Sequence, residues 1–513
     1  MQSLKAPRVE GPGRERWVLV ATILGSSMTF IDGTAVNVAL PALQADLGAT
    51  VSEVQWVIEA YALFLSALLL VGGSLGDRYG RRRIFLLGVA AFAVASAACG
   101  LAANTGQLIA ARAVQGIAAA LLVPGSLALL SASFDETRRG KAVGAWSGFS
   151  AITAAVGPLL GGWLVDRASW RWVFFINLPL ALAVVAIALC WVPESRDEED
   201  TGRPDLAGAL LATVGLGGLT FSLIESSHLG WGHPLVWGAL LAGVASLVGF
   251  LAVESRAASP MMPLSLFRSR TFAGANLLTL WLYAALGGAL FFLPFDLIQM
   301  HGYSATAAGA ALLPFILMMF LLSRWAGALA DRFGPRLPLT LGPAVAAAGY
   351  VLLAVPGLGG RYWTTFFPAI LVLGLGMAIC VAPLTTAVLG AAERRHAGIA
   401  SGINTAVSRS AGLLAIAVLG VVMLGIFSRG LDRRLAGSAL PAAARQEMGA
   451  QREKLAALPI PAGLPEPARQ QARSAVGRAF LAGFRGVMLT AAGLALLASL
   501  SAWRMIGTEL EKK

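Results

Sequence analysis

The chain has 513 residues, of which 57% are hydrophobic and only 13% charged, and its net charge is +12. A water-soluble chain carries about 25% charged residues. The composition therefore excludes an ordinary soluble enzyme, a disordered protein and, despite the positive charge, a soluble nucleic-acid-binding protein. A mean hydropathy of +0.73 indicates a membrane protein. The isolated cysteines Cys99, Cys190 and Cys380 predict neither a disulfide framework nor a metal site.

Fourteen apolar stretches are long enough to cross a bilayer core of about 30 Å as helices. The first follows a basic N-terminus and continues past Asp32 to Pro41, so we expect an uncleaved helix rather than a signal peptide. The stretches are residues 17–41, 54–73, 84–103, 108–131, 143–165, 172–192, 207–224, 234–253, 272–297, 305–330, 337–355, 364–389, 397–427 and 480–503. The predicted fold class is an all-α integral membrane protein with 14 transmembrane helices.

Positive charge alternates between successive connections, and short loops rich in Lys and Arg stay on the cytoplasmic side. The positive set is Arg78, Arg81, Arg82, Arg83, Arg138, Arg139, Lys141, Arg196, Arg203, Arg256, Arg268, Arg270, Arg332, Arg336, Arg394 and Arg395, against Arg167, Arg171 and Arg361 in the opposing short loops. We therefore expect both termini in the cytoplasm and residues 428–477 as one long outer loop, with a short helix from Pro441 to Leu458.

An internal repeat divides the chain. The sequence GSLGDRYGRRR at 73–83 falls between stretches two and three, and GALADRFGPR at 327–336 falls between stretches ten and eleven. This spacing predicts two six-helix bundles, related as a parallel repeat, with two helices inserted between them. The predicted parts are a cytoplasmic N-terminus 1–16, an N-terminal bundle 17–192, a linker 193–204, the inserted pair 205–253, a linker 254–270, a C-terminal bundle 271–505 that includes the outer loop, and a tail 506–513.

The repeated loop combines a turn, a carboxylate that can cap a helix or pair with Arg, and a cluster of arginines. For Arg82 and Arg83 we favour a role in topology alone. The acid is less easily explained by topology, because it recurs in the second copy. At these residues the chain resembles the major facilitator superfamily, whose loop of this pattern holds the inward side shut. The resemblance implies a gating role for Gly73, Asp77, Arg78, Gly80, Arg81, Asp331 and Arg332.

Three ionisable residues lie inside the first bundle at a shared depth. Asp32 precedes Pro41 by nine residues, Glu59 follows Glu53 by six and Arg112 follows Gln107 by five. At 1.5 Å per residue, these three residues lie about 8–14 Å from the outer surface. A charge at mid-bilayer costs about 2.5–3.5 kcal/mol, so such groups face a cavity or one another. A structural ion pair is the alternative, but Arg112 can pair with only one acid in a simple salt bridge. We favour proton coupling, since a carboxylate can release its proton when a cation approaches.

A second motif lies in the fifth stretch, where Gly157, Pro158, Gly161 and Gly162 form Gly-Pro-x-x-Gly-Gly. Small residues and a proline permit close helix packing and bending, and a tight helix contact is the simpler explanation. The motif also looks like the one associated with antiporters in the superfamily.

Further motifs narrow the resemblance to the fourteen-helix drug:proton antiporter family. They are FIDGTAVNVALP at 30–41, WVIEAY at 56–61, RAVQG at 112–116, WRWVFFINLP at 170–179, and Gly402-Ile-Asn404 with Arg409. The family places its proton-coupling acid at Asp32, its cavity arginine at Arg112 and sometimes an acid at Glu59. We expect Asp32, Glu59, Gln115, Asp296, Asn404 and Arg409 to line the substrate cavity. For Asp296 a wet helix end is an equal alternative, and Arg409 could instead reach the inner headgroups.

The predicted function is proton-coupled efflux of amphipathic, often cationic, small molecules by a multi-pass protein of the bacterial inner membrane. An uptake symporter or a lipid or metabolite exporter is the nearest alternative. A polytopic membrane enzyme is less favoured, because no phosphate-binding loop or catalytic cluster is visible in the sequence. The expected partners are substrate, protons, membrane lipids and, at the outer loop, a periplasmic adaptor protein. No cofactor and no nucleic acid are expected.

Overall fold

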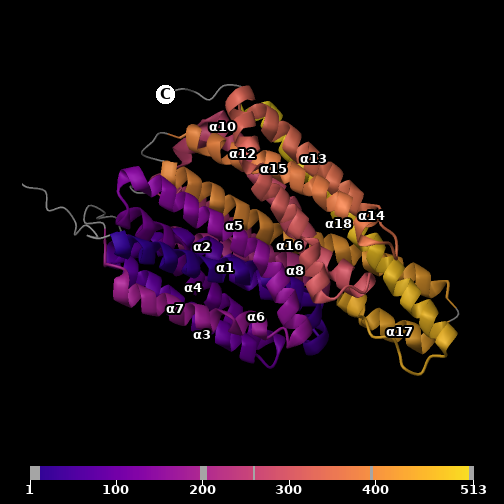
Figure 1. The fold of residues 1–513 in the computed structure, drawn as a ribbon. Helices are drawn as coiled ribbons and strands as arrows, with labels where there is room; N and C mark the ends of the chain where they lie inside the picture. Colours follow the sequence, from indigo (N-terminus) through magenta and orange to yellow (C-terminus); the bar gives the residue numbers. More distant parts are fainter. Residues whose placement is uncertain are drawn as a thin grey trace, which may run out of the picture. The chain divides into compact units, whose positions relative to one another are not determined.

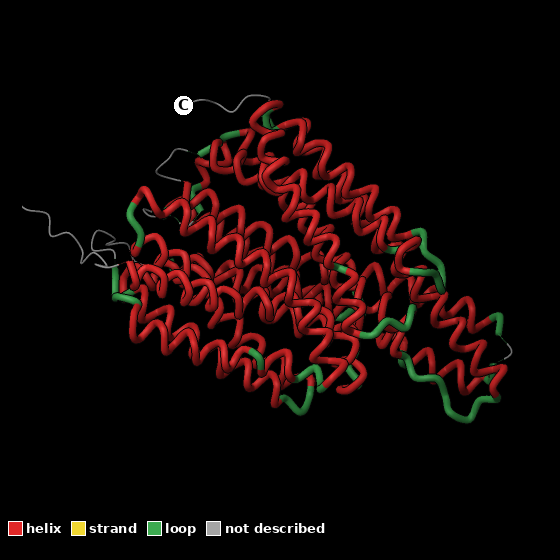
Figure 2. The backbone as a smooth tube through the Cα atoms, viewed as in Figure 1, coloured by secondary structure: helices red, strands yellow, loops and turns green. Residues whose placement is uncertain are grey.

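The computed structural model describes residues 12–196, 205–257, 260, 262–392, 397–438 and 440–507. Throughout these ranges the regular secondary structure is helical, and loops only join helices (Figure 2). Fourteen of the described helical segments are long and apolar enough to cross a membrane. The predicted fold class and helix number are confirmed.

The first part of the chain, coloured indigo to magenta in Figure 1, runs from α1 to α9. Its helices are α1 (Pro12–Leu47), α2 (Val51–Tyr79), α3 (Arg81–Leu101), α4 (Thr105–Ser133), α5 (Glu136–Arg167), α6 (Trp172–Phe175), α7 (Asn177–Trp191), α8 (Leu206–Leu229) and α9 (Pro234–Arg256).

The second part follows a short 3-10 turn, η1 (Leu264–Arg268). Its elements are α10 (Arg270–Phe295), the π-helical turn η2 (Asp296–Met300), α11 (Ala305–Ala311), α12 (Leu313–Phe333), α13 (Arg336–Ala354), α14 (Tyr362–Thr365), α15 (Phe367–Gly390), α16 (Ala397–Ala436), α17 (Ala442–Ala450), η4 (Arg452–Ala457) and α18 (Glu466–Met505).

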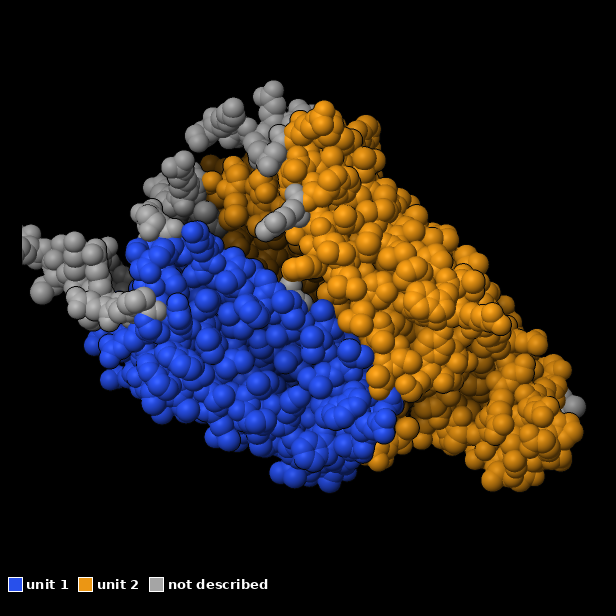
Figure 3. Space-filling model, in the orientation of Figure 1, with its two compact units in different colours: residues 1–39, 56–214, 246–261 blue, residues 40–55, 215–245, 262–513 orange. Residues whose placement is uncertain are grey.

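Two compact units divide the chain (Figure 3). Unit 1 holds residues 1–39, 56–214 and 246–261, and unit 2 holds residues 40–55, 215–245 and 262–513. The division crosses α1, α2, α8 and α9, because compact units follow spatial contacts rather than chain order.

Prolines explain two breaks inside predicted spans. The span expected at 305–330 is divided at Leu312 into α11 and α12, and Pro314 lies in the first turn of α12. Pro368 likewise lies in the first turn of α15, after the short helix α14. Proline has no N–H to donate to the preceding turn and is accommodated at a helix start.

Much of the segment 428–477, expected as an outer loop, is helical. Helices α16 and α18 contain 40 residues each, or about 60 Å, twice the length that a bilayer core of about 30 Å requires. They include residues 428–436 and 466–477, so the part of this segment between the two long helices is 437–465. Within it, α17 and η4 lie inside the stretch expected to be helical. The alanine-rich, polar sequence of these extensions favours helix, but a search for apolar spans does not detect it.

Small residues bring α1 and α5 into direct contact within unit 1. A Cβ on Gly161 would lie 2.7 Å from the Cβ of Ala35 and 2.9 Å from its carbonyl oxygen. A Cβ on Gly157 would collide with the Thr34 hydroxyl. The tight helix contact expected from Gly-Pro-x-x-Gly-Gly is therefore present, and it lies next to the turn of α1 that carries Asp32.

This contact predicts that Gly161→Ala destabilises the protein although alanine favours helix. Overpacking costs about 1–3 kcal/mol, which exceeds the gain of about 1 kcal/mol from replacing a helical glycine. Gly148→Ala in the same helix is the control, because nothing lies within 4 Å of its added Cβ. Thermal unfolding of both purified variants should show a lower Tm for Gly161→Ala only. Equal Tm values would mean that α1 and α5 do not require this close approach.

Candidate functional site

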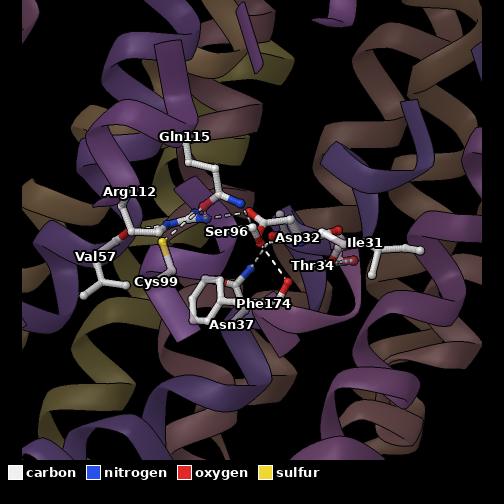
Figure 4. Close-up of polar contacts among 12 residues, drawn as sticks. Ile31, Asp32, Thr34, Asn37, Val57, Ser96, Cys99, Arg112, Gln115 and Phe174 are labelled. Carbon is white, nitrogen blue, oxygen red and sulfur yellow. Dashed lines mark hydrogen bonds and ion pairs between the residues drawn. The ribbon is translucent and has the colours of Figure 1, made fainter. Parts of the chain in front are cut away.

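A closed hydrogen-bond network joins Asp32 of α1 to Arg112 and Gln115 of α4 (Figure 4). Arg112 donates from one terminal nitrogen to Asp32 Oδ2 at 2.6 Å and to Gln115 Oε1 at 2.7 Å. Gln115 Nε2 in turn donates to Asp32 Oδ1 at 3.0 Å. Both carboxylate oxygens are thus paired, and the two charged side chains are 1% and 0% exposed.

Local helix geometry places these groups. Arg112 and Gln115 are three residues apart and so share a face of α4. The Nε of Arg112 donates to the Val57 carbonyl of α2 at 2.9 Å, and its guanidinium lies 4.2 Å from the centre of the Tyr61 ring. A Cβ on Gly116 would collide with the Tyr61 carbonyl, so glycine here lets α2 and α4 approach closely. A buried ion pair is stable only when its remaining hydrogen-bonding atoms are satisfied.

Glu59 stays outside the network. Its side chain is fully buried, yet neither carboxyl oxygen has a hydrogen-bond partner among the residues that the structure describes. Of the three residues expected at a shared depth, the structure joins Asp32 to Arg112 and gives Glu59 no hydrogen bond to either. A shared depth does not fix the direction in which a side chain leaves its helix, because each residue turns the helix by about 100°.

A second layer of polar groups supports the network and was not identified from the sequence. Cys99 of α3 lies 3.6 Å from Gln115 Oε1. One turn away, Ser96 donates to the Phe174 carbonyl at 2.8 Å and accepts from Asn177 at 3.0 Å. Asn177 belongs to the motif at 170–179. The three-residue spacing of Ser96 and Cys99 is the only sequence signal that links them to one helix face.

The repeated loop forms a compact ionic turn between α2 and α3. Arg81 Nε donates to Asp77 Oδ1 at 2.7 Å, and Gly80 has φ +109°, a conformation that side chains disfavour. Glu194, which the sequence placed in a linker, accepts from the Arg82 backbone N–H at 3.0 Å and lies 3.6 Å from Arg83 Nε. Arg82 and Arg83, expected to act in topology alone, therefore also bind Glu194.

The second copy of the loop repeats the backbone geometry. Gly334 between α12 and α13 has φ +74°, as expected for the counterpart of Gly80. The guanidinium of Arg332 lies 5.2 Å from the centre of the Phe333 ring. The side chain of Asp331 lies outside the part of the chain that the structure describes.

Two further predicted cavity residues occupy polar positions in unit 2. Asn404 of α16 donates to Asn276 Oδ1 at 3.2 Å and to Thr279 Oγ1 at 2.7 Å. Both partners lie on α10 and were missed in the sequence. Arg409, also on α16, is half-buried.

Asp296 is not a wet helix end, because its side chain is 1% exposed. It opens the π-helical turn η2 and lies 3.4 Å from Nε2 of His301. The solvent-exposed alternative for this residue is therefore wrong.

The paired geometry predicts strong energetic coupling between Asp32 and Arg112. Arg112→Met or Asp32→Leu should each lower the free energy of unfolding by about 3–5 kcal/mol, because each leaves a buried charge without its partner. The double variant removes both charges and should lose clearly less than the sum. Reversible unfolding in mixed micelles measures all three. Additive losses would show that the two side chains do not stabilise one another.

Comparison with known proteins agrees with these features. The sequence profile of the Major Facilitator Superfamily matches residues 22–416. The tetracenomycin C resistance and export protein of Streptomyces glaucescens is 36% identical over 493 residues, which cover 94% of this chain and 90% of that protein. The puromycin resistance protein pur8 of Streptomyces alboniger is 37% identical over 422 residues, covering 81% and 83%.

The fold is also similar to solved transporters. A bacterial homolog of the human lysosomal transporter Spinster, in an inward-facing and unoccupied conformation, aligns with a TM-score of 0.65 at 17% identity over 97% of this chain and 99% of that one. The xylose transporter XylE of E. coli, inward open, aligns with a TM-score of 0.58 at 14% identity. The chain therefore belongs to the major facilitator superfamily.

Proposed function

We propose that this protein exports amphipathic, often cationic, small molecules in exchange for protons, by alternating access. The observation that carries the proposal is the buried network of Asp32, Arg112 and Gln115. The relatives named for tetracenomycin C export and puromycin resistance support the direction and the class of substrate.

Exchange follows from competition for one carboxylate. In the network, Arg112 lies close enough to balance a negative charge on the Asp32 carboxylate. Protonation of Asp32 weakens its attraction to Arg112, because a neutral carboxyl attracts a guanidinium far less than a carboxylate does. A cationic substrate would replace the proton as the positive partner. Because proton and substrate compete for this acid, release of one accompanies binding of the other.

Glu59 has a different role in this proposal. Burying an ionised carboxylate without a partner costs several kcal/mol, so the neutral acid is the form that suits its present position. When the bundle opens and water reaches α2, Glu59 can ionise and attract a cationic substrate. We therefore assign ligand charge recognition to Glu59 and proton coupling to Asp32 and Arg112, with Gln115 orienting the carboxylate.

Gating would depend on contacts at the repeated loop. The Asp77–Arg81 pair and the Glu194 carboxylate hold the turn around Gly80 in one conformation. We propose that this turn, together with its counterpart at Gly334, keeps the inner side closed in part of the cycle. The orientation rests on the positive charge of these loops, which favours the cytoplasmic side of a bacterial inner membrane.

The loop at 437–465 would then face the outer side. Within unit 2 it is fixed by Glu453, which lies 3.0 Å from His228 Nδ1, and by the Lys454 carbonyl, which accepts from Gln44 at 3.3 Å. We propose its exposed helix α17 as the surface for a periplasmic adaptor, and the apolar outer faces of the spanning helices as the surface for membrane lipids.

The coupling role predicts that Asp32→Asn keeps the fold but abolishes uphill efflux. Asparagine retains an oxygen that can accept from Arg112 but cannot carry a proton. In proteoliposomes with an imposed pH gradient, substrate accumulation should fall at least about tenfold, the change expected when an acid–base group is lost. Asp432→Asn is the control, because Asp432 is exposed and paired only with Arg452 among the contacts described. Wild-type accumulation by Asp32→Asn at equal expression would remove Asp32 from the coupling step.

The recognition role of Glu59 makes a separate prediction. Glu59→Gln should weaken binding of a lipophilic cation about 5–150-fold, the range of typical coupling energies, and leave a neutral substrate of similar size almost unaffected. Equilibrium binding to purified protein measures both. Equal loss for cation and neutral compound would instead make Glu59 a structural residue or a second proton carrier.

A further inference from the structure

A second buried acid–base pair lies in unit 2, apart from the Asp32 network. Asp296 Oδ2 is 3.4 Å from His301 Nε2, and the two side chains are 1% and 2% exposed. Neither carboxylate oxygen and neither ring nitrogen has a hydrogen bond to any other residue in the described ranges. Buried polar atoms are normally satisfied, so an unsatisfied group needs an explanation.

The backbone that joins the two residues is unusual. Residues Asp296–Met300 form the π-helical turn η2, closed by a hydrogen bond from the His301 N–H to the Asp296 carbonyl at 3.1 Å. π-Helical turns are rare in proteins, and those that occur often lie at functional sites. His301 follows Asp296 by five residues, and the extra residue of the π turn brings both onto one face. In an ordinary α-helix, residues three or four apart share a face instead.

In the described ranges, no other charged side chain makes an ion pair or a hydrogen bond with either member of the pair. The preceding turn of α10 is apolar and aromatic, α11 has no titratable side chain, and the His301 ring lies 4.9 Å from the ring of Phe366. On η4, Arg452 and Glu453 lie against Asp432 and His228, and Lys454 is half-buried. On α18, Arg473, Arg478 and Arg485 are exposed.

Tyr303 is the remaining titratable group that faces the pair. Burial and the nearby Asp296 carboxylate raise the pKa of its hydroxyl. Tyr303 therefore stays neutral near neutral pH.

The same turn is tied to two other segments of unit 2. Gln299 donates to Gln44 Oε1 at 3.0 Å, and Gln44 donates to the Lys454 carbonyl at 3.3 Å. Gln44 lies near the end of α1 and Lys454 lies on η4. A change in the π turn would therefore reach both the end of α1 and the loop at 437–465.

We propose that Asp296 and His301 form a proton-binding site whose occupancy controls closure of this end of unit 2. With a proton on His301, the imidazolium and the Asp296 carboxylate attract one another in a water-poor site and hold the π turn closed. Without that proton, Asp296 is a buried carboxylate with no positive partner. The turn then opens to water, and its tie through Gln44 loosens.

In the transport cycle this site would act from the outer side, which rests on the proposed function and orientation. An acidic exterior would protonate His301 and favour closure after substrate has left. The proton would be lost, and the turn released, when the exterior becomes alkaline. The direction suits an exporter that returns inward with protons bound.

Hydrogen–deuterium exchange of the full-length protein in nanodiscs tests the site without requiring transport. After correction for the intrinsic pH effect, amides of residues 296–303 should exchange at least about tenfold more slowly in acidic than in alkaline buffer, because the ion pair that holds the turn closed needs the proton. His301→Asn and the isosteric Asp296→Asn should each abolish this difference. His233→Asn, which changes a histidine of another loop, should retain it.

The outcomes separate this inference from the proposed function. A pH-dependent protection that persists in either folded variant would overturn the Asp296–His301 site, whatever the protein transports. If one variant does not fold, the other still decides. If protection responds as expected but no pH gradient drives efflux by the wild type, the site stands and the proposed proton exchange fails.

Discussion

The lack of water inside a membrane-spanning bundle makes the Arg112 guanidinium the group on which unit 1 depends. One side chain satisfies Asp32, Gln115 and the Val57 carbonyl and packs on Tyr61. Removing any of these partners would leave a charge or dipole that lipid cannot solvate. The close approach at Gly116 has the same origin, because α2 and α4 must lie near enough for Arg112 to reach the Val57 carbonyl and the Tyr61 ring.

The two buried acids of unit 1 then have different chemical environments. Asp32 is fully hydrogen-bonded and paired, whereas Glu59 is buried without a described partner. Environments that separate two carboxyl groups assign them different tasks. Coupling needs an acid whose partner can be exchanged, and recognition of a cation needs an acid that is uncharged until the ligand or water arrives. Unit 2 adds a third acid in another setting, where Asp296 faces a histidine instead of an arginine.

Much of this could be predicted from the sequence, and the failures have physical causes. Apolar length gave the number of helices, and equal depth brought Asp32 together with Arg112. Depth alone could not place Glu59, because it says nothing about direction around the helix axis. Polar helical extensions at 428–436 and 466–477 escaped a search for apolar spans. Sequence periodicity also could not reveal Glu194 and Asn276, because their partners are distant in sequence. It could not reveal the position of His301, because a π turn sets it.

Exchange of a proton at Asp32 as substrate comes and goes is tested most directly by adding a lipophilic cation to purified protein in weakly buffered solution and recording the pH. We expect the wild type to release protons in proportion to the cation bound. Asp32→Asn should release clearly fewer protons per bound cation, because only Glu59 can then ionise, while Asp432→Asn behaves as wild type. Saturable binding of the cation with the same proton release from Asp32→Asn as from the wild type would contradict proton exchange at Asp32.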